Sequence, residues 1–485
     1  MLRPTLIASL LFSLAFVAGV HADERGAGAS PAAAPPAIAP PAFADPFDTA
    51  ASIPPVRCVP PTPADALDLA GVIDQALCNN PQTREAWAAA RAQAGLVGVA
   101  RAAWLPNLSA SVGSNRVRTA GDERETTRAT VNSAGLSFSW LLYDFGVREA
   151  TLESARQLLA AAIATQDSTT QAVFLAALQA FYQNHALQAA LDAAELSEKA
   201  ARESLAAADA RYRAGSATPA DRLQAQTALS QATLTRIRVG GELKNAQGAL
   251  ANSMGLDAHR PLRLAPLAAT TPPGDFERNV DSLIDEARRR RPDLAAAEAQ
   301  AQAADATVDA TRAAHLPTIT LGAQPTWQNN AGLGSDSQSI GLTVNIPLFS
   351  GFGQTYKVRT AEAQAEQRAA QRDRLRLQVA LDVWRSYQNL LTATQSLRST
   401  ADLLASAEQS ERVALGRYRA GVGSILDLLT AQSALASARQ QRVQSTYDWN
   451  VSRATLAQSV GILDAGLLPA LTGTLPSLPA ANGKP

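Results

Sequence analysis

Histidine and cysteine are scarce in this chain, which has four histidines and two cysteines among 485 residues. The histidines show no metal-ligand spacing such as H-E-x-x-H. The chain also lacks a G-x-S-x-G motif, a P-loop and a G-x-G-x-x-G motif after a strand. These absences argue against an enzyme, and we expect neither a cofactor nor a metal site.

An excess of charge of either sign is also lacking, because 43 Lys and Arg residues balance 43 Asp and Glu residues. The largest basic block, Arg288–Arg291, falls at the end of a predicted helix, where cations interact favourably with the helix dipole. We therefore expect no nucleic acid as a partner. After the first 20 residues, no segment approaches twenty uncharged apolar residues, so no transmembrane helix is expected.

The first residues have the pattern of an export signal. Arg3 precedes an apolar run, Leu6–Val20, which ends at the small-residue site Val20-His21-Ala22, so residues 1–22 are predicted to be a signal peptide. Residues 23–63 contain eleven prolines among many alanines and are expected to be extended or disordered.

The two cysteines, Cys58 and Cys78, suggest one disulfide in an exported chain. Such a bond would close a loop of about 20 residues and contribute about 3 kcal/mol in the chain-entropy model. The alternative is two unpaired buried thiols. Neither cysteine directly follows the apolar run, so N-terminal lipidation is not expected.

What the chain does have is a duplication. The letters RYRAG occur at residues 211–215 and again at 417–421, and RAAWLPNL at 101–108 matches RAAHLPTI at 312–319. We therefore divide the chain into two repeats with a linker and a tail. The predicted segments are repeat 1 at 64–256, a linker at 257–276, repeat 2 at 277–463 and a C-terminal tail at 464–485.

Each repeat shows the same order of elements. Prolines separate a short helix from a second helix and then stop that second helix. The apolar period then changes to two, which predicts strands of about 9–12 residues, and a long proline-free helix and a return helix of about 37 residues follow. The predicted ranges are helices 65–79 and 277–290, helices 82–105 and 293–316, hairpins 107–142 and 318–349, and long helices 147–214 and 353–420.

The helix lengths suggest how the helices pack. The return helix and the earlier 24-residue helix together match the long helix in length, so the two could lie end to end along it. Spacings of four and three predict a coiled-coil seam rich in alanine. Its predicted members are Leu187, Leu191, Ala194, Glu198, Ala201, Leu205, Ala208 and Tyr212, and in the second repeat Ala393, Leu397, Thr400, Leu404, Ala407, Glu411, Ala414 and Tyr418.

Four strands per chain limit the architecture. Their alternating apolar faces, with Trp140 and Trp327 as candidate interface aromatics, are typical of strands in contact with lipid. A four-stranded sheet has two unpaired edges and cannot enclose a lumen, so other copies must complete it in a bilayer. Three copies would supply 12 strands. The expected fold class is mainly α with a membrane β-barrel continued by a helical tunnel.

These motifs together resemble the TolC-like outer-membrane factor family. The resemblance covers about residues 65–465 and rests on ALCNNP (76–81), ARRRRPDLAAAEA (287–299), the doubled RYRAG and DLLTAQSAL (427–435). It implies a homotrimer with a 12-stranded barrel in outer-membrane lipid and a helical tunnel across the periplasm. The implied partners are a periplasmic adaptor protein and an inner-membrane ABC or RND-type transporter.

The resemblance also implies where the tunnel closes. Asp427 occupies the position of an acidic residue at the constriction, and Tyr418 that of a tyrosine which helps to hold the gate shut. Thr430 stands where the family has a second acidic residue, so the polar network must differ. Asp221, the first-repeat counterpart of Asp427, is a further candidate for the gate. The alternative role for both aspartates is to cap helices, in Thr218-Pro-Ala-Asp221 and Ser424-Ile-Leu-Asp427.

The RYRAG turns are the candidate adaptor contacts. Their alternative role is a helix C-cap, with glycine at positive φ and arginine beside the last carbonyls. The candidate residues are Arg211, Arg213, Gly215, Arg417, Arg419 and Gly421.

The expected function is an exit channel of a tripartite export system, for type I protein secretion or for efflux of small molecules. One alternative is drug or solvent efflux alone. Another is a structural coiled-coil protein of the envelope, against which the lipid-patterned strands argue.

Overall fold

A computed structural model describes residues 66–121, 124–266, 279–330 and 333–464. The predicted signal peptide, the proline-rich segment and most of the tail lie outside the described residues. The first repeat comprises α1 (Leu69–Asn79), α2 (Pro81–Ala102), β1 (Asn107–Gly121), β2 (Arg124–Tyr143), α3 (Val147–Arg213) and α4 (Pro219–Ser253). The second comprises α5 (Val280–Arg290), α6 (Pro292–Ala313), β3 (Thr318–Asn330), β4 (Leu333–Asn345), α7 (Gly353–Arg419) and α8 (Ile425–Val460).

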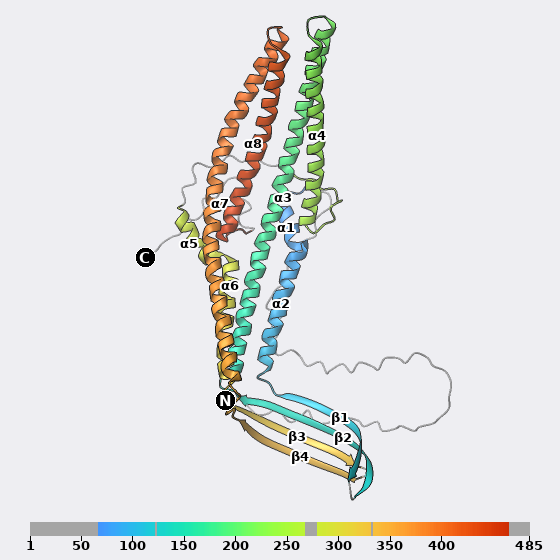
Figure 1. The fold of residues 1–485 in the computed structure, drawn as a ribbon, viewed down its shortest axis with the longest axis vertical. Coiled ribbons are helices and arrows are strands. Elements are labelled where there is room, and N and C mark those ends of the chain that lie inside the picture. Colours follow the sequence, from blue (N-terminus) through green and yellow to red (C-terminus); the bar gives the residue numbers. More distant parts are fainter. Residues whose placement is uncertain (1–65, 122–123, 267–278, 331–332, 465–485) are drawn as a thin grey trace, which may run out of the picture. The chain divides into compact units, whose positions relative to one another are not determined.

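The predicted order of elements in the two repeats is confirmed (Figure 1). The long helices α3 and α7 have 67 residues each, and the return helices α4 and α8 have 35 and 36. The short helices begin later than expected, because Asp68 and Asn279 accept hydrogen bonds as N-caps of α1 and α5. The predicted arginine-rich helix end is also confirmed, with α5 ending at Arg290.

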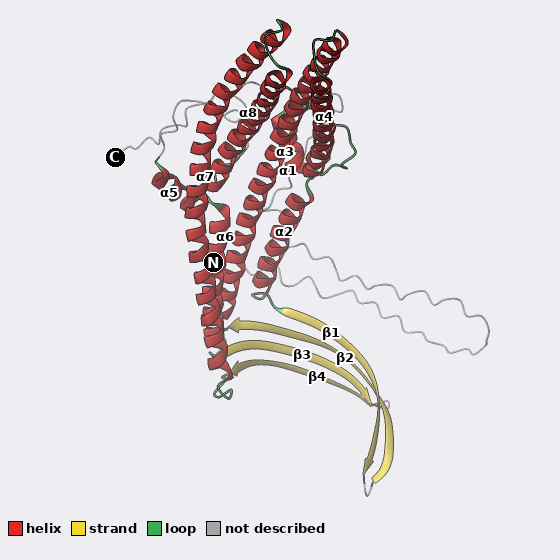
Figure 2. Ribbon diagram, turned by 45° about the horizontal axis from the view of Figure 1, so that its top comes forward, coloured by secondary structure: helices red, strands yellow, loops and turns green. Residues whose placement is uncertain are grey.

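The four strands form one antiparallel sheet in the order β1-β2-β3-β4 (Figure 2). The expected strand length of 9–12 residues was wrong, because β1 and β2 have 15 and 20 residues and β3 and β4 have 13 each. In β2 the apolar alternation begins at Leu136, but polar residues that come before it, such as Thr130 and Asn132, already belong to the strand. Conversely, Ile346 and Leu348 continue the alternation beyond the end of β4.

The long helices organise the packing. Both α2 and α4 contact α3, while α6 and α8 contact α7, as predicted for shorter helices laid along a long one. In addition, α3 contacts α6 and α8, which joins the two repeats. Phe174, Leu178 and Phe181 of α3 form an apolar core with α1 and the end of α4. None of the helices in the described ranges is both long and apolar enough to cross a membrane.

The seam prediction is correct for most positions and wrong for one. Ala194, Ala201 and Ala208 are buried in the first repeat, as alanine allows close approach of helices. Tyr212, however, is 39 % exposed, whereas its counterpart Tyr418 is 3 % exposed. The copies differ because Tyr418 packs with Ile425 and Leu428, which the first repeat lacks.

Candidate functional site at the ends of the helical hairpins

The turn between α3 and α4 is fixed by backbone and capping interactions. Gly215 adopts φ +71°, and Ser216 N donates to Arg211 O at 2.9 Å, which closes the last turn of α3. Thr218 and Asp221 form a capping box: Thr218 N donates to Asp221 Oδ2 at 2.9 Å, and Asp221 N donates to Thr218 Oγ1 at 3.3 Å. The predicted N-cap and the positive φ of the C-cap glycine are confirmed here, whereas Arg211 donates to a carbonyl of α7 and not to one of its own helix.

The turn between α7 and α8 repeats this geometry. Gly421 adopts φ +81°, and Ser424 and Asp427 form the second capping box, with Asp427 N donating to Ser424 Oγ at 3.1 Å. A Cβ on Gly423 would lie 3.1 Å from Tyr418 N, so the chain folds back tightly here. Asp427 therefore caps α8, and its side chain is still exposed, so capping does not prevent it from also facing a channel.

The two hairpin ends meet through Arg211 and Tyr418. The Arg211 guanidinium lies 4.2 Å from the centre of the Tyr418 ring, and its Nη2 donates to the Tyr418 carbonyl oxygen. This carbonyl belongs to the last turn of α7 and also accepts a hydrogen bond from Gly421 N at 3.1 Å. Arg211, a predicted adaptor contact, is thus half-buried against Tyr418, a predicted gate residue of the other repeat.

The other predicted residues lie at the surface. Arg417, Arg419 and Thr430 are exposed, and none of the ion pairs in the described part of the chain includes either arginine. Arg213 is also exposed but pairs with Asp209 at 2.5 Å. Asp221 is half-buried in its capping box. The predicted constriction residues Asp427 and Thr430 thus share an exposed surface, whereas Tyr418 lies beneath it.

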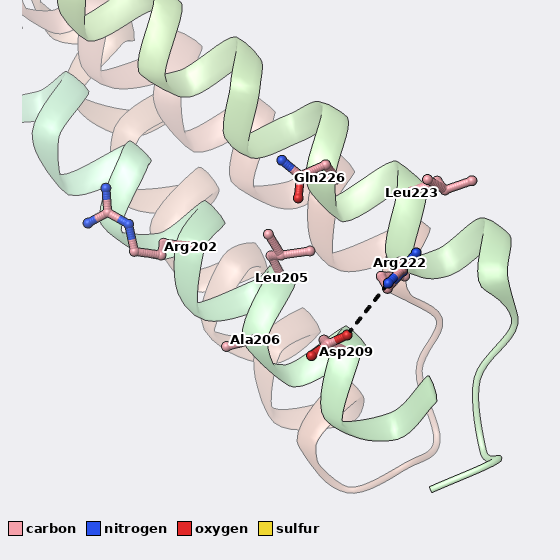
Figure 3. A pocket seen from close by; sticks show the side chains of 7 residues that line it. All are labelled: Arg202, Leu205, Ala206, Asp209, Arg222, Leu223 and Gln226. Carbon is pink, nitrogen blue, oxygen red and sulfur yellow. Dashed lines mark ion pairs between the residues drawn. The ribbon is translucent and has the colours of Figure 1, made fainter. Parts of the chain in front are cut away.

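A groove between α3 and α4, missed in the sequence, lies beside the first turn (Figure 3). Its volume is about 500 Å³. Asp209 and Arg222 face each other across it at 4.0 Å, and the Arg222 guanidinium lies 5.3 Å from the centre of the Tyr212 ring. Leu223 is 58 % exposed at its edge. One local signal in the sequence indicated the charged side of this groove: Asp209 and Arg213 are four residues apart on a helix and can form an ion pair.

A buried carboxylate ties α3 to α4. Glu198, a seam residue, accepts hydrogen bonds from Thr233 Oγ1 at 2.8 Å and Arg236 Nε at 2.9 Å. The Thr233 hydrogen bond, with the charges of Arg236 and Arg202, holds the pKa of Glu198 below its usual value. Its counterpart Leu404 instead borders an apolar cluster between α7 and α8. The sequence signal for these hydrogen bonds between α3 and α4 was the position of Glu198, a charged residue, within an alanine-rich seam.

Cys78, in α1, is disulfide-bonded, whereas Cys58 lies outside the described residues. The Cys58–Cys78 pairing therefore stays a prediction. Among the residues that the structure describes, no group of three or more His, Cys, Asp or Glu side chains could hold a metal ion.

Comparison with known proteins finds similarity to outer-membrane export proteins over most of the chain. The family model described as outer membrane efflux protein matches residues 72–256 and 283–462, which span both repeats. Protein CyaE of Bordetella pertussis is 34 % identical over 371 residues, covering 75 % of this chain and 78 % of that protein. Proteases secretion protein PrtF of Dickeya chrysanthemi is 24 % identical over 421 residues, covering 83 % and 90 %.

The fold also matches a solved structure. The outer membrane protein VceC from Vibrio cholerae aligns with a TM-score of 0.71 at 20 % identity, covering 81 % of this chain and 96 % of that chain. The TolC-like resemblance is therefore confirmed, and the doubled helix–hairpin–helix arrangement is the fold of this class. The chain belongs to the outer membrane efflux protein family and is an exit channel of the outer membrane.

Proposed function

We propose that three copies of this chain form a duct that carries type I secretion substrates through the outer membrane, working with a periplasmic adaptor and an inner-membrane transporter. The observation that carries the proposal is the open sheet, whose edges β1 and β4 have no partner strand in the described chain. Three sheets of four strands would give 12, within the range of outer-membrane barrels. The name of PrtF, which refers to protease secretion, supports a protein cargo.

Deleting the gene tests the cargo directly. We expect at least one protein to disappear from the culture medium while resistance to drugs and solvents stays within about twofold. A duct for small molecules would give the reverse, with an unchanged secretome and a marked rise in drug sensitivity. Purified protein that is monomeric without detergent and shows no conductance in planar bilayers would contradict the duct itself.

The gate in this proposal consists of Arg211 and Tyr418 within each chain and Asp427 around the axis. Arg211 contacts both the ring and the carbonyl of Tyr418, so it holds the α7–α8 hairpin end against the α3–α4 hairpin end. Asp427 is exposed beside this contact, and three copies would form one ring of carboxylates. Thr430 adds no charge, so the ring has a single layer.

Replacing Asp427 with asparagine should reduce the cation selectivity of the channel and weaken its block by divalent cations by about tenfold. The reason is that a ring of three carboxylates attracts cations at a narrow passage. Single-channel recording in planar bilayers measures both properties. Asp221→Asn is the matched control, since it removes the same group from the first capping box. Unchanged selectivity and block in Asp427→Asn would remove Asp427 from the constriction.

The adaptor contact is assigned to the exposed residues Arg213, Gly215, Arg417, Arg419 and Gly421. Replacing Arg417 and Arg419 with glutamate should reduce chemical cross-linking to the adaptor by more than tenfold, because both arginines are exposed without ion pairs in the described chain. The trimer should persist.

The control for that charge reversal replaces Arg374 and Arg376 with glutamate. These two are also exposed on α7, but they lie more than forty residues before the turn, so cross-linking should be retained. If the variant at Arg417 and Arg419 still cross-links at the wild-type level, the assignment of the contact to this turn is wrong.

A further inference from the structure

Three arginines share one face of the β1–β2 hairpin. Arg118 and Arg128 are directly opposite each other in the antiparallel register, and Arg116, opposite Thr130, is two residues from Arg118. Because side chains alternate along a strand, all three project from the same face. Each of them is exposed. The hairpin therefore concentrates three positive charges within a few residues.

This arrangement is unfavourable unless an anion is present. Like charges directly opposite in a β-sheet destabilise the pair. None of the ion pairs among the described residues includes Arg116, Arg118 or Arg128. Asp336 is on the same face but on β4, level with Trp327 and Ala134 and thus well before the arginines along the sheet. No carboxylate whose side chain the structure describes pairs with these three arginines.

The same face carries the apolar band of the sheet. On β2 this face runs from Tyr143, which pairs with Ile319 after a register shift, to Ala134, about 30 Å along the strand at 3.3 Å per residue. At the ~40° tilt of barrel strands this covers about 23 Å of bilayer depth, close to the ~25 Å apolar band of outer-membrane barrels. Arg128 precedes Ala134 by six residues and lies near the start of β2. Figure 2 shows that β2 begins at the end of the sheet that is distant from the helices. The arginines therefore lie beyond the hydrocarbon level, where lipid headgroups are found.

The opposite face has no such character. It presents small uncharged side chains, including Ser109 paired with Ser137, and Ser133 between Gly113 and Gln328. Since the arginines share the apolar face, they are directed to the lipid side of the sheet. A guanidinium group binds phosphate oxygens with two parallel hydrogen bonds, which gives this site its ligand chemistry.

We propose that Arg116, Arg118 and Arg128 bind phosphate groups of membrane-lipid headgroups on the outside of the sheet. The proposal rests on insertion of this sheet into the outer membrane, as in the proposed function. The bound phosphates would neutralise the opposed Arg118 and Arg128 and would hold the β1–β2 hairpin at a defined depth in the bilayer.

The test is native mass spectrometry of the detergent-purified trimer, titrated with bisphosphorylated lipid A and with the same lipid after removal of both phosphates. The wild-type protein should bind the phosphorylated lipid at least tenfold more tightly. The variant with Arg116, Arg118 and Arg128 all changed to glutamine should lose this preference. Arg118→Gln alone, which also relieves the opposed charges and so should not impair folding, should weaken binding of the phosphorylated lipid by about threefold.

A charge-matched control changes Arg374, Arg376 and Arg385 of α7 to glutamine, which removes three exposed positive charges outside the sheet. This control should bind like the wild type. Equal binding by the wild type and the sheet variants, or equal loss in the α7 control, would overturn the site. Wild-type trimers without conductance in planar bilayers would instead count against the proposed duct.

Discussion

Replacing Arg211 with alanine is expected to open the channel, seen as a rise in the open fraction of single channels and increased sensitivity of cells to large antibiotics. Arg211 donates to the Tyr418 carbonyl and lies over the Tyr418 ring, and this joins residues 207 positions apart. A charged hydrogen bond with a cation–π contact is worth about 2 kcal/mol at a partly exposed site. Such a loss shifts the open-to-closed ratio about 30-fold.

The Tyr418 side chain offers a sharp control. Arg211 contacts its ring and main-chain oxygen, and no hydrogen bond of the Tyr418 hydroxyl is found among the described residues. Tyr418→Phe should therefore keep the channel closed, whereas Tyr418→Leu should open it. Arg213→Ala, which within the chain breaks only the exposed pair with Asp209, should leave the open fraction in planar bilayers, where no adaptor is present, unchanged. If Tyr418→Phe opens the channel as fully as Arg211→Ala, the hydroxyl and not the ring holds the gate.

Replacing Gly255 with alanine is expected to prevent accumulation of folded protein or to lower its unfolding temperature by several degrees. Gly255 follows the end of α4 at φ +70°, and an added Cβ would lie 2.5 Å from the carbonyl oxygen of Asn79, the last residue of α1. The left-handed conformation costs alanine about 1–2 kcal/mol, and overpacking typically costs a further 1–3 kcal/mol. Loss of helical circular dichroism on heating in detergent measures the effect.

The second repeat predicts the same result at Gly461, where a Cβ would lie 2.9 Å from the carbonyl of Arg290 at the end of α5. Gly241 is the matched control, because it lies within α4 with no atom inside 4 Å of an added Cβ. Gly241→Ala should stabilise the helix by about 0.5–1 kcal/mol. An unfolding temperature for Gly255→Ala equal to that of the wild type would show that the helix ends can separate without cost.

These two contacts explain how helices come to lie end to end. Each return helix is followed by a glycine at positive φ, and this glycine contacts the break between the two shorter helices of the same repeat. The sequence predicted the break, from Asn80-Pro81 and Arg291-Pro292, and it predicted the matching lengths. It did not predict that Gly255 and Gly461 touch those breaks, because the contacting residues are more than 160 positions apart.

The kind and order of the elements and the lengths of the helices follow from the sequence alone, because caps, prolines, positive-φ glycines and apolar periods act within a few residues; the strand lengths do not. Its duplication and motifs also identified the family. Only the tertiary structure decided which copy of a repeated residue is buried, as with Tyr212 and Tyr418. It likewise placed Arg211 on Tyr418 and the three hairpin arginines on the apolar face. Packing of α3 against the second repeat and the register of the strands set these neighbours, and neither is encoded in any local stretch of chain.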